Sequence, residues 1–237
     1  MISTELEFAS GNLEGVLAAF LSLPSSLRPR HFSDDEVDVS RRKSIDNSRD
    51  FALFFHKRTT GFFLFGPFLS CLASIAPSKS IIIYCSIDGE PALAKQFLIH
   101  MASAQPIFGF ACAPEEREWR NRVVTKQGLN SIESWVGRDT LKYIPGLYWL
   151  TLLPNALAQK HGVSLAAIES IARDVIEIGS GQLLFQFYER PEDWRSTAAV
   201  AELCASLAGI FDVEKVRPQL ANARNFLDLN AILRNWK

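Results

Sequence analysis

Apolar residues recur along this chain with two spacings, and each spacing predicts a different kind of element. Intervals of three and four residues, which place side chains on one face of a helix, mark several segments. Pro24 and Pro106 close the first two of these segments, and Pro91 begins the second, as is common at helix ends. The helical pattern covers residues 11–24, 90–106, 115–124, 164–174 and 196–211.

Strand patterns occupy much of the sequence between these helices. Residues 107–113 alternate between two faces, and residues 80–89 form a nearly continuous apolar run that is typical of a central strand. Residues 50–66 predict a β-hairpin, in which two aromatic strands flank a turn at Arg58–Gly61. A further pair of strands is expected at residues 175–179 and 182–189.

Interleaved strands and helices favour an α/β (α+β) fold, in which helices pack on a mixed, largely antiparallel sheet. At 237 residues the chain is long enough for one large domain, residues 1–237, with a sizeable core. Two similar halves, 1–130 and 131–237, are an alternative, with the division near residues 128–140. Residues 25–50 are polar and charged, so we expect an exposed loop there.

The segment YIPGLYWLTLLPNALAQKHG, residues 143–162, could form a pocket, a membrane segment or part of the core. Leu147–Leu153 is apolar at nearly every position, which suits a buried strand. Pro145 and Gly146 provide the turn before this strand, and Pro154 marks the change to a short helix. We therefore expect a core strand that makes no direct contact with a partner.

A second uncharged segment, residues 59–78, is about long enough to span a bilayer. It contains Gly66, Pro67 and Pro77, so a buried strand followed by a short buried helix explains it better. The first basic residue is Arg28, and glutamates precede it, which does not fit a secretory signal. The sequence thus predicts neither a membrane span nor an export signal.

Composition and charge narrow the range of functions. Hydrophobic residues make up 48% and charged residues 22% of the chain, which is typical of a folded globular protein. The 17 phenylalanines predict a core built from large rings. The net charge of −1 shows no basic excess, so a dedicated nucleic-acid-binding role is not expected.

The cysteines favour a reducing compartment. Cys71, Cys85, Cys112 and Cys204 each lie in an apolar stretch, and none forms a Cys-x-x-Cys motif. We therefore expect four buried free thiols, no disulfide framework and a cytoplasmic location.

No sequence motif for catalysis, cofactor binding or metal binding is present. The chain lacks a P-loop, a Gly-x-Gly-x-x-Gly loop, a Gly-x-Ser-x-Gly elbow, a His-Glu-x-x-His helix and an Asp/Glu-x-Lys nuclease motif. Glu115, Glu116 and Glu118 stand at the start of a predicted helix, where carboxylates favour the helix dipole and face water. We expect no cofactor and no metal, although a Cys–His pair assembled in space stays open.

The order of several segments resembles a known family. These segments are FGFACAPEEREWRNRV at residues 108–123, LKYIPGLYWLTLLPNALAQKHG at 141–162 and VIEIGSGQLLFQFYERPEDW at 175–194. They are similar to immunity proteins that protect bacteria against their own type VI secretion effectors. The motif YIPGLYW at residues 143–149 is the most specific, and the resemblance extends over about Ile107–Phe211.

The resemblance implies a cytoplasmic immunity protein that binds and neutralises a cognate secreted toxin by protein–protein contact. It implies a nuclease-like effector as that toxin, and no catalytic residues in this chain, which would then not be an enzyme. Direct nucleic-acid binding is not expected, and a homo-oligomer is compatible with this function. Two alternatives stay open: a small enzyme whose Cys/His or carboxylate site is assembled in space, and a regulatory binding module.

Acidic side chains are the candidates for contact with such a toxin, because inhibitors of nucleases often mimic phosphate. One acidic group lies in the predicted loop, and a second follows a strand and includes a tryptophan, a residue type that is enriched in hot spots. Two further glutamates are expected near the second group. The candidate toxin-contact residues are Asp34, Asp35, Glu36, Asp38, Glu115, Glu116, Glu189, Glu192, Asp193 and Trp194.

Overall fold

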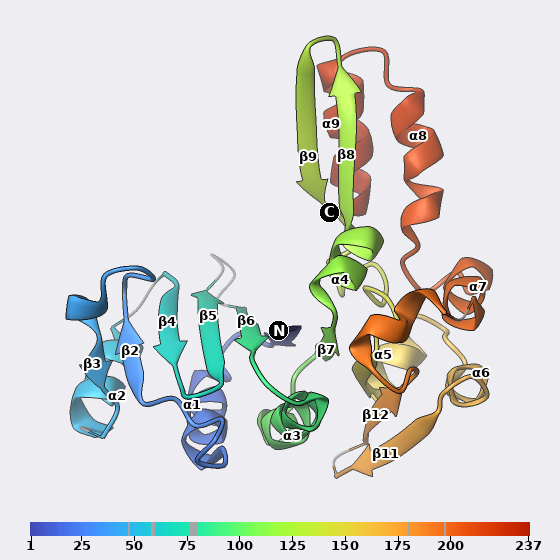
Figure 1. Cartoon of the computed structure of the whole chain (residues 1–237). Coiled ribbons are helices and arrows are strands. Elements are labelled where there is room, and N and C mark those ends of the chain that lie inside the picture. Colours follow the sequence, from blue (N-terminus) through green and yellow to red (C-terminus); the bar gives the residue numbers. More distant parts are fainter. Residues whose placement is uncertain (47, 58–59, 76–79, 180, 197) are drawn as a thin grey trace.

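Ten strands form one continuous sheet in the computed structural model, which describes all residues except 47, 58–59, 76–79, 180 and 197 (Figure 1). Their order is β11-β12-β10-β7-β1-β6-β5-β4-β2-β3, and each neighbouring pair is antiparallel. The predicted α+β fold, with a largely antiparallel sheet and helices packed on it, is confirmed. The strands are β1 (Ile2–Phe8), β2 (His31–Ser33), β3 (Lys43–Ser44), β4 (Phe62–Phe65), β5 (Leu69–Ile75), β6 (Ile81–Ile87), β7 (Phe108–Cys112), β10 (Leu150–Pro154), β11 (Asp174–Ile178) and β12 (Gln182–Gln186).

Strand β1 lies near the centre of the sheet, although the sequence pattern above does not include it. It pairs with β6 along its whole length, from Ile2 opposite Ile87 to Phe8 opposite Ile81, and with β7 on its other side. Its residues alternate strictly between buried and half-buried positions. One face of β1 therefore packs on the core, and the other face is partly open.

Three helices cover one face of the sheet where it is formed by β1 to β6 (Figure 1). Phenylalanine rings fill the space between these helices and the strands. Phe20 contacts Phe97 with ring centroids 6.4 Å apart, and Phe32 contacts Phe51 at 5.1 Å. The predicted core of large rings is thus confirmed. The helices are α1 (Leu13–Ser22), α2 (Ser48–His56) and α3 (Pro91–Met101).

The opposite face of these strands is only partly covered. The pairing register places Leu72 of β5 beside Tyr84 of β6, and Tyr84 beside Glu5 of β1, so these side chains form one row across the sheet. All three are half-buried, and Ser70 in the next row is exposed. We call this surface the open face, and it consists of Ser3, Glu5, Glu7, Ser70, Leu72, Ser74, Ile82, Tyr84 and Ser86.

Strand β10 is buried on both faces. Every residue from Tyr143 to Leu153 is buried, which confirms the predicted core location of this segment. The indole Nε1 of Trp149 donates a hydrogen bond of 3.1 Å to the carbonyl oxygen of Tyr188. The elements around β10 are α5 (Asn155–Lys160), α6 (Leu165–Glu169), the 3-10 helix η3 (Pro191–Arg195) and α7 (Ala199–Ser206).

A smaller unit projects from the sheet and has its own core (Figure 1). Val123, Val216 and Leu229 are buried in this core. The predicted division at residues 128–140 falls in the hairpin of this projecting unit, and the ten-stranded sheet continues across it. The boundary therefore does not separate two sheets. Helix α4 (Pro114–Asn121) leads into the projecting unit, which consists of β8 (Arg122–Gln127), β9 (Asn130–Trp135), α8 (Arg217–Ala221) and α9 (Phe226–Trp236).

The first half of the predicted aromatic hairpin is wrong, because it forms helix α2. Phe51 and Phe54, three residues apart, both contact Phe32, with ring centroids 5.1 and 4.6 Å from its own. In a strand these two side chains would point to opposite faces. The second half is confirmed as β4, whereas Arg58 and Thr59 of the predicted turn lie outside the described residues.

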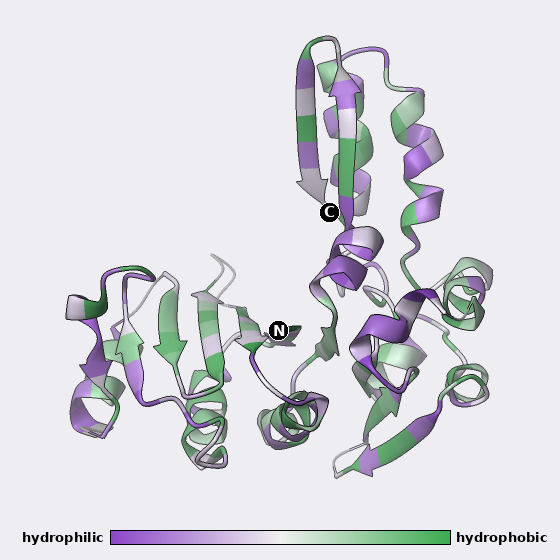
Figure 2. Cartoon of the chain, in the orientation of Figure 1, coloured by the Kyte–Doolittle hydropathy of each residue, from purple (hydrophilic) through white to green (hydrophobic). Residues whose placement is uncertain are grey.

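Two other segments also differ from the predictions. Residues 62–75 form the hairpin of β4 and β5, which are hydrophobic along most of their length (Figure 2), and not a strand followed by a helix. Among the described residues, no helix is both long enough and apolar enough to cross a membrane. Residues 25–50 include β2 and the edge strand β3, and Phe32 and Ile45 are buried, so this segment is not a simple exposed loop.

Cys71 and Cys85 form a disulfide bond, contrary to the expectation of four free thiols. They face each other directly in the register of β5 and β6, with Cα atoms 4.1 Å apart. Such a cross-strand pair brings the two sulfur atoms within bonding reach. Cys112 and Cys204 are free and buried, as expected. The reducing compartment inferred from four free thiols therefore loses its basis.

Replacing Trp149 with alanine should lower the free energy of unfolding by about 3–5 kcal/mol, because it removes a large buried ring. Trp149 is 2% exposed, and its hydrogen bond to Tyr188 would also be lost. Urea unfolding measures the change. Leu129→Ala, at a fully exposed residue of the β8–β9 turn, is the control and should change stability by less than about 0.5 kcal/mol. Equal unfolding midpoints for the two variants would contradict the core assignment.

Removing the disulfide by the double substitution Cys71→Ala and Cys85→Ala should lower stability by about 3 kcal/mol. The bond closes a loop across a sequence separation of 14 residues, and its loss restores conformational freedom to the unfolded chain. Thermal melting with and without reductant tests this. Reductant should lower the melting temperature of the parent protein and leave that of the double variant unchanged. A parent that melts identically in both conditions would show that the bond is absent.

Candidate functional site

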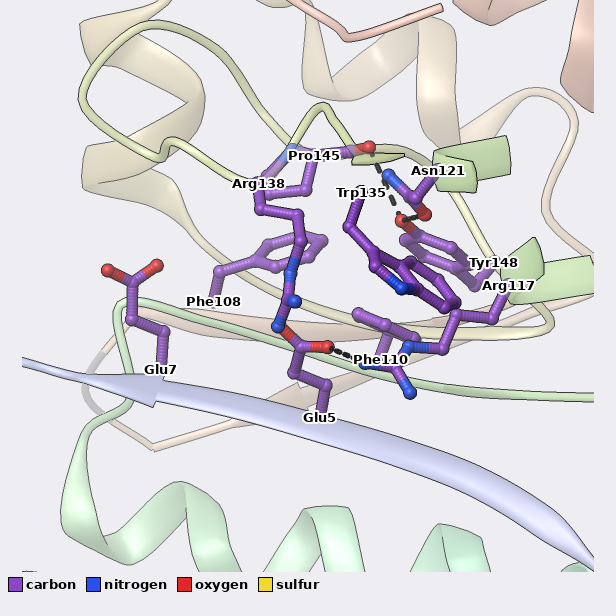
Figure 3. Close-up of a pocket in the computed structure, with 10 residues that line it drawn as sticks. All are labelled: Glu5, Glu7, Phe108, Phe110, Arg117, Asn121, Trp135, Arg138, Pro145 and Tyr148. Carbon is purple, nitrogen blue, oxygen red and sulfur yellow. Dashed lines mark hydrogen bonds and ion pairs between the residues drawn. The ribbon is translucent and has the colours of Figure 1, made fainter. Parts of the chain in front are cut away.

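The open face meets the projecting unit at a corner lined by charged and aromatic side chains (Figure 3). The free space in this corner is about 10 Å³, which is room for a single water molecule. It is therefore a filled surface and not a pocket for a small molecule. The corner is lined by Glu5, Glu7, Phe108, Phe110, Arg117, Asn121, Trp135, Arg138, Pro145 and Tyr148.

Glu5 of β1 binds two arginines that come from different parts of the chain. Its Oε2 accepts a hydrogen bond of 2.9 Å from Arg117 of α4, and its Oε1 accepts one of 2.5 Å from Arg138, which follows β9. The same Arg138 nitrogen lies 2.6 Å from the hydroxyl oxygen of Tyr84. The Glu5 side chain is 12% exposed, whereas Arg117 and Arg138 are 22% and 28% exposed. Both arginines thus keep part of their surface available to a partner.

Aromatic rings hold the two guanidinium groups in place. The Cζ atom of Arg117 lies 4.9 Å from the ring centroid of Trp135 and 5.5 Å from that of Tyr84. The Cζ atom of Arg138 lies 5.0 Å from the ring centroid of the same Tyr84. Cation–π contacts of this kind are worth about 0.5–2 kcal/mol each, depending on solvent exposure. They orient the arginines before any partner binds.

Two arginines and two carboxylates line the corner, so its formal charges balance. Two arginines share the single carboxylate of Glu5, and the next carboxylate along the strand, Glu7, has a raised pKa because of its burial. A hydrogen bond from the Thr140 side chain and the charge of Arg138 oppose this rise in the pKa of Glu7 only in part. The exposed parts of the two guanidinium groups, and not a net charge, are what the corner offers to a carboxylate of a partner.

A groove continues from the corner over the open face. Its cavity has a volume of about 180 Å³ and shares Arg117 with the corner. Ser70, Leu72 and Tyr84 lie along it, and Glu36 from the acidic loop between β2 and β3 borders it. The groove therefore has a positive end at Arg117 and an acidic residue on its border.

A buried charge pair lies behind the corner on helix α4. Oε1 of Glu116 accepts a hydrogen bond of 2.9 Å from Nε of Arg120, whose Nη2 lies 3.0 Å from the hydroxyl oxygen of Tyr188. The other oxygen of Glu116 accepts a hydrogen bond from the backbone N–H of Trp149. Burial raises the pKa of Glu116 to about 7, although the guanidinium of Arg120 acts in the opposite direction.

Two of the predicted toxin-contact residues are buried and cannot meet a partner at the surface. Glu116 is 0% exposed and belongs to the charge pair described above. Trp194 is 8% exposed and packs against Trp119 with ring centroids 5.4 Å apart. The sequence analysis expects glutamates at the start of this helix to face water. Glu116 instead lies on the buried face of α4, where it pairs with Arg120.

The other predicted contact residues divide between the two edges of the sheet. Asp34, Asp35, Glu36 and Asp38 follow β2, near one edge, whereas Glu189, Glu192 and Asp193 follow β12, near the other. They therefore do not form one acidic surface. Glu115 is exposed on α4, which the contact between Trp119 and Trp194 places beside η3.

Most of these acids already interact within the chain. Arg41 pairs with both Asp34 and Asp35 at 2.6 and 3.4 Å, and backbone N–H groups lower the pKa of Asp35. Asp38 accepts hydrogen bonds from Ser40. Glu189 pairs with Arg173, and Asp193 accepts a hydrogen bond from the backbone of Arg190. Of the acidic candidates, Glu36 is the one that borders the groove of the open face.

The cysteines and histidines form no reactive pair in the part of the chain that the structure describes. Burial raises the pKa of the free thiols Cys112 and Cys204, so neither is poised to act as a thiolate nucleophile. His100 and His161 contact backbone carbonyl oxygens of Gln96 and Thr140. The same described residues contain no group of three His, Cys, Asp or Glu side chains that could hold a metal ion.

The residues that dominate the corner, Glu5, Tyr84, Arg117 and Arg138, are absent from the sequence-based candidates. A local signal exists for Glu5, because the segment ISTELEF alternates apolar and polar residues as a half-open strand does. No local signal exists for its partners, since 133 residues separate Glu5 from Arg138. No protein family, curated protein sequence or solved structure matches this chain in the three comparisons made.

The raised pKa of Glu116 leads to a pH-dependent difference in stability between the parent and Glu116→Gln. The folded-state pKa of about 7 exceeds the ordinary value of 4.5, so the folded protein binds an additional proton between these values. The stabilisation this gives is fully present below pH 4.5 and is lost as the pH rises through 7. Relative to the glutamine variant, the parent should lose about 2–3 kcal/mol between pH 5 and 8.

Urea unfolding at half-unit pH steps measures this difference. Glu118→Gln, on the exposed side of the same helix, controls for the general effect of removing a carboxylate. Parallel pH profiles for the parent and Glu116→Gln would contradict the assigned ionisation of Glu116.

Proposed function

We propose that this chain is an immunity-type inhibitor, which binds a protein toxin across the open face and neutralises it by contact. The observation that carries this proposal is the junction of a partly uncovered sheet face with the arginine-rich corner. Antiparallel sheets often expose one polar face to water, but this face also presents Leu72, Ile82 and Tyr84. Aromatic residues and arginine together are typical of the centre of protein–protein interfaces.

The partly exposed arginines favour a partner that brings a carboxylate to the corner. Arg117 and Arg138 are oriented by aromatic rings and share one glutamate, so an additional acidic group would gain hydrogen bonds without a new ordering cost. Glu36, on the border of the groove, suits a basic group of the same partner. This arrangement differs from phosphate mimicry, which would need a strongly acidic surface.

The family resemblance supports the proposal through the segments that build the junction. Tyr148 of the YIPGLYW motif stacks on Phe110, with ring centroids 3.8 Å apart, and its hydroxyl group donates to Asn121 of α4. These motif residues are buried, so the resemblance rests on residues that build the fold and leaves the identity of the toxin open. We propose a type VI secretion effector as the toxin, with a nuclease-like activity.

The compartment of action follows from the toxin. A nuclease effector requires inhibition in the cytoplasm, where nucleic acid is found. The disulfide between Cys71 and Cys85 favours an oxidising compartment such as the bacterial periplasm instead. Thiol trapping with an alkylating reagent in intact cells, followed by mapping of the modified residues, distinguishes the two, because Cys71 and Cys85 are alkylated only where their bond is reduced.

Co-expression with the toxin encoded by the neighbouring gene tests the proposed function. Growth should be restored when both proteins are made, and the two should co-purify as a complex. Growth arrest with no complex would contradict the proposal and would favour an enzyme or a regulatory binding module.

A substitution on the open face should weaken toxin binding without unfolding the protein. Ser70→Arg places a long side chain at an exposed position of the groove, where it should lower affinity at least about tenfold by steric exclusion. Ser103→Arg is the matched control, since Ser103 is exposed just after α3, away from the groove. Affinity is measured by surface plasmon resonance and folding by thermal melting. Equal affinities for the two variants would place the toxin on another surface.

A further inference from the structure

A second cavity lies on the other side of helix α4, between α7 and the 3-10 helix η4 (Val213–Lys215). Its volume is about 290 Å³, which is close to the lower end for small-molecule sites. Trp119, Pro145 and Phe211 provide apolar walls, and Arg120 and Cys204 lie at its buried end. The toxin-binding surface proposed above does not use this cavity.

Arg120 gives the cavity an unusual chemical character. Its side chain is 8% exposed, and its Cζ atom lies 5.3 Å from the ring centroid of Trp119. Two of its three guanidinium nitrogens are hydrogen-bonded, Nε to Glu116 and Nη2 to Tyr188. Among the described residues, no acceptor pairs with the third nitrogen, Nη1. Nη1 is not one of the fully buried atoms that lack a partner, so its N–H donors reach the free space of the cavity, where an anion can accept hydrogen bonds from them.

We propose that this cavity binds the carboxylate group of a small molecule that has an apolar body, with Arg120 as the anion-binding residue. The carboxylate takes the donors of Nη1, and the apolar body lies against Trp119 and Phe211. Arginine suits this role, because its planar guanidinium matches a carboxylate and is always charged.

The entrance of the cavity selects for a single negative charge. Glu202, Asp212 and Glu214 line it on the side of α7 and η4. Asp212 accepts a hydrogen bond from the backbone of Glu214, and Glu214 pairs with Arg217, so both are held in place. These carboxylates repel phosphate groups and dicarboxylates more strongly than a monocarboxylate, whose single charge passes them and is then paired with Arg120.

Glu116 couples this binding to pH. It shares Arg120 with the ligand, so the ligand carboxylate binds best when Glu116 has taken up a proton from solvent. The titratable and charged groups that interact with Glu116 are Arg120 on the same helix, Tyr188 after β12, Cys112 of β7 and Cys204 of α7. Since Glu116 has a pKa of about 7, affinity should fall about tenfold between pH 6 and pH 8.

Hexanoate and hexanamide are matched probes that differ in charge and hardly in shape. Titrations at pH 6, followed by 15N–1H NMR, should show saturable hexanoate shifts at the Trp119 indole and the Gly146 amide. Hexanamide should bind at least tenfold more weakly, because it has no charge to pair with Arg120. Equal binding of the two probes, or no saturable shift by hexanoate at millimolar concentration, would overturn the proposal.

Two substitutions on α7 locate the binding. Ala205→Trp fills the cavity from an exposed position of its wall and should abolish the hexanoate shifts, whereas Ser206→Trp, on the adjacent exposed residue outside the cavity, should preserve them. Thermal melting confirms that both variants are folded. Unchanged hexanoate binding to folded Ala205→Trp would place the ligand elsewhere.

Glu116→Gln tests the coupling to pH. This variant cannot exchange the proton, so its affinity for hexanoate should vary by less than about twofold between pH 6 and pH 8. A tenfold dependence that persists in folded Glu116→Gln would contradict the role of Arg120 and Glu116 in the site. These outcomes do not depend on toxin binding.

Discussion

The architecture depends on helix α4, whose charged side chains connect the sheet, the projecting unit and the buried C-terminal strands. Arg117 is hydrogen-bonded to Glu5 in β1. Arg120 and Glu116 point into the core, where Arg120 contacts the hydroxyl group of Tyr188 and Glu116 accepts a hydrogen bond from the backbone N–H of Trp149, just before β10. Asn121, the last helical residue, exchanges hydrogen bonds with Val136 after β9 and accepts one from Tyr148. Eight residues thus fix the angle at which the projecting unit leaves the sheet.

Charged groups are expensive to bury, and each of the two ion-pair clusters limits this cost in a different way. At the corner, two arginines keep 22% and 28% of their side chains exposed and share one glutamate. In the core, Glu116 moves its pKa to about 7, which reduces the charge that must be held there. The first arrangement leaves donors available to a protein partner, and the second leaves a cation beside a cavity. Both proposed sites therefore arise from the same helix.

Local patterns predict the parts of this structure that have local causes. The apolar run of residues 143–153 is buried, and β4, β6, β7, α1 and α3 form where spacing indicates them. Local spacing does not predict helix α2, because a short aromatic run is compatible with a helix or a strand. The contacts of Phe32 with Phe51 and Phe54, which favour the helix, join separate segments of the chain. The Cys71–Cys85 bond and the Glu5–Arg138 pair depend on strand register and on contacts between distant segments, which no local pattern contains. The corner could therefore not be predicted from the sequence, although the fold class could.

Hydrogen–deuterium exchange on the protein alone and in its co-purified toxin complex tests the central claim most directly, because it reports the contacted surface without any substitution. The account predicts slower exchange on complex formation in β5, β6 and residues 135–138, which carry the groove and the corner. Slower exchange confined to η3, α6 and α7, with β5 and β6 unchanged, would contradict it.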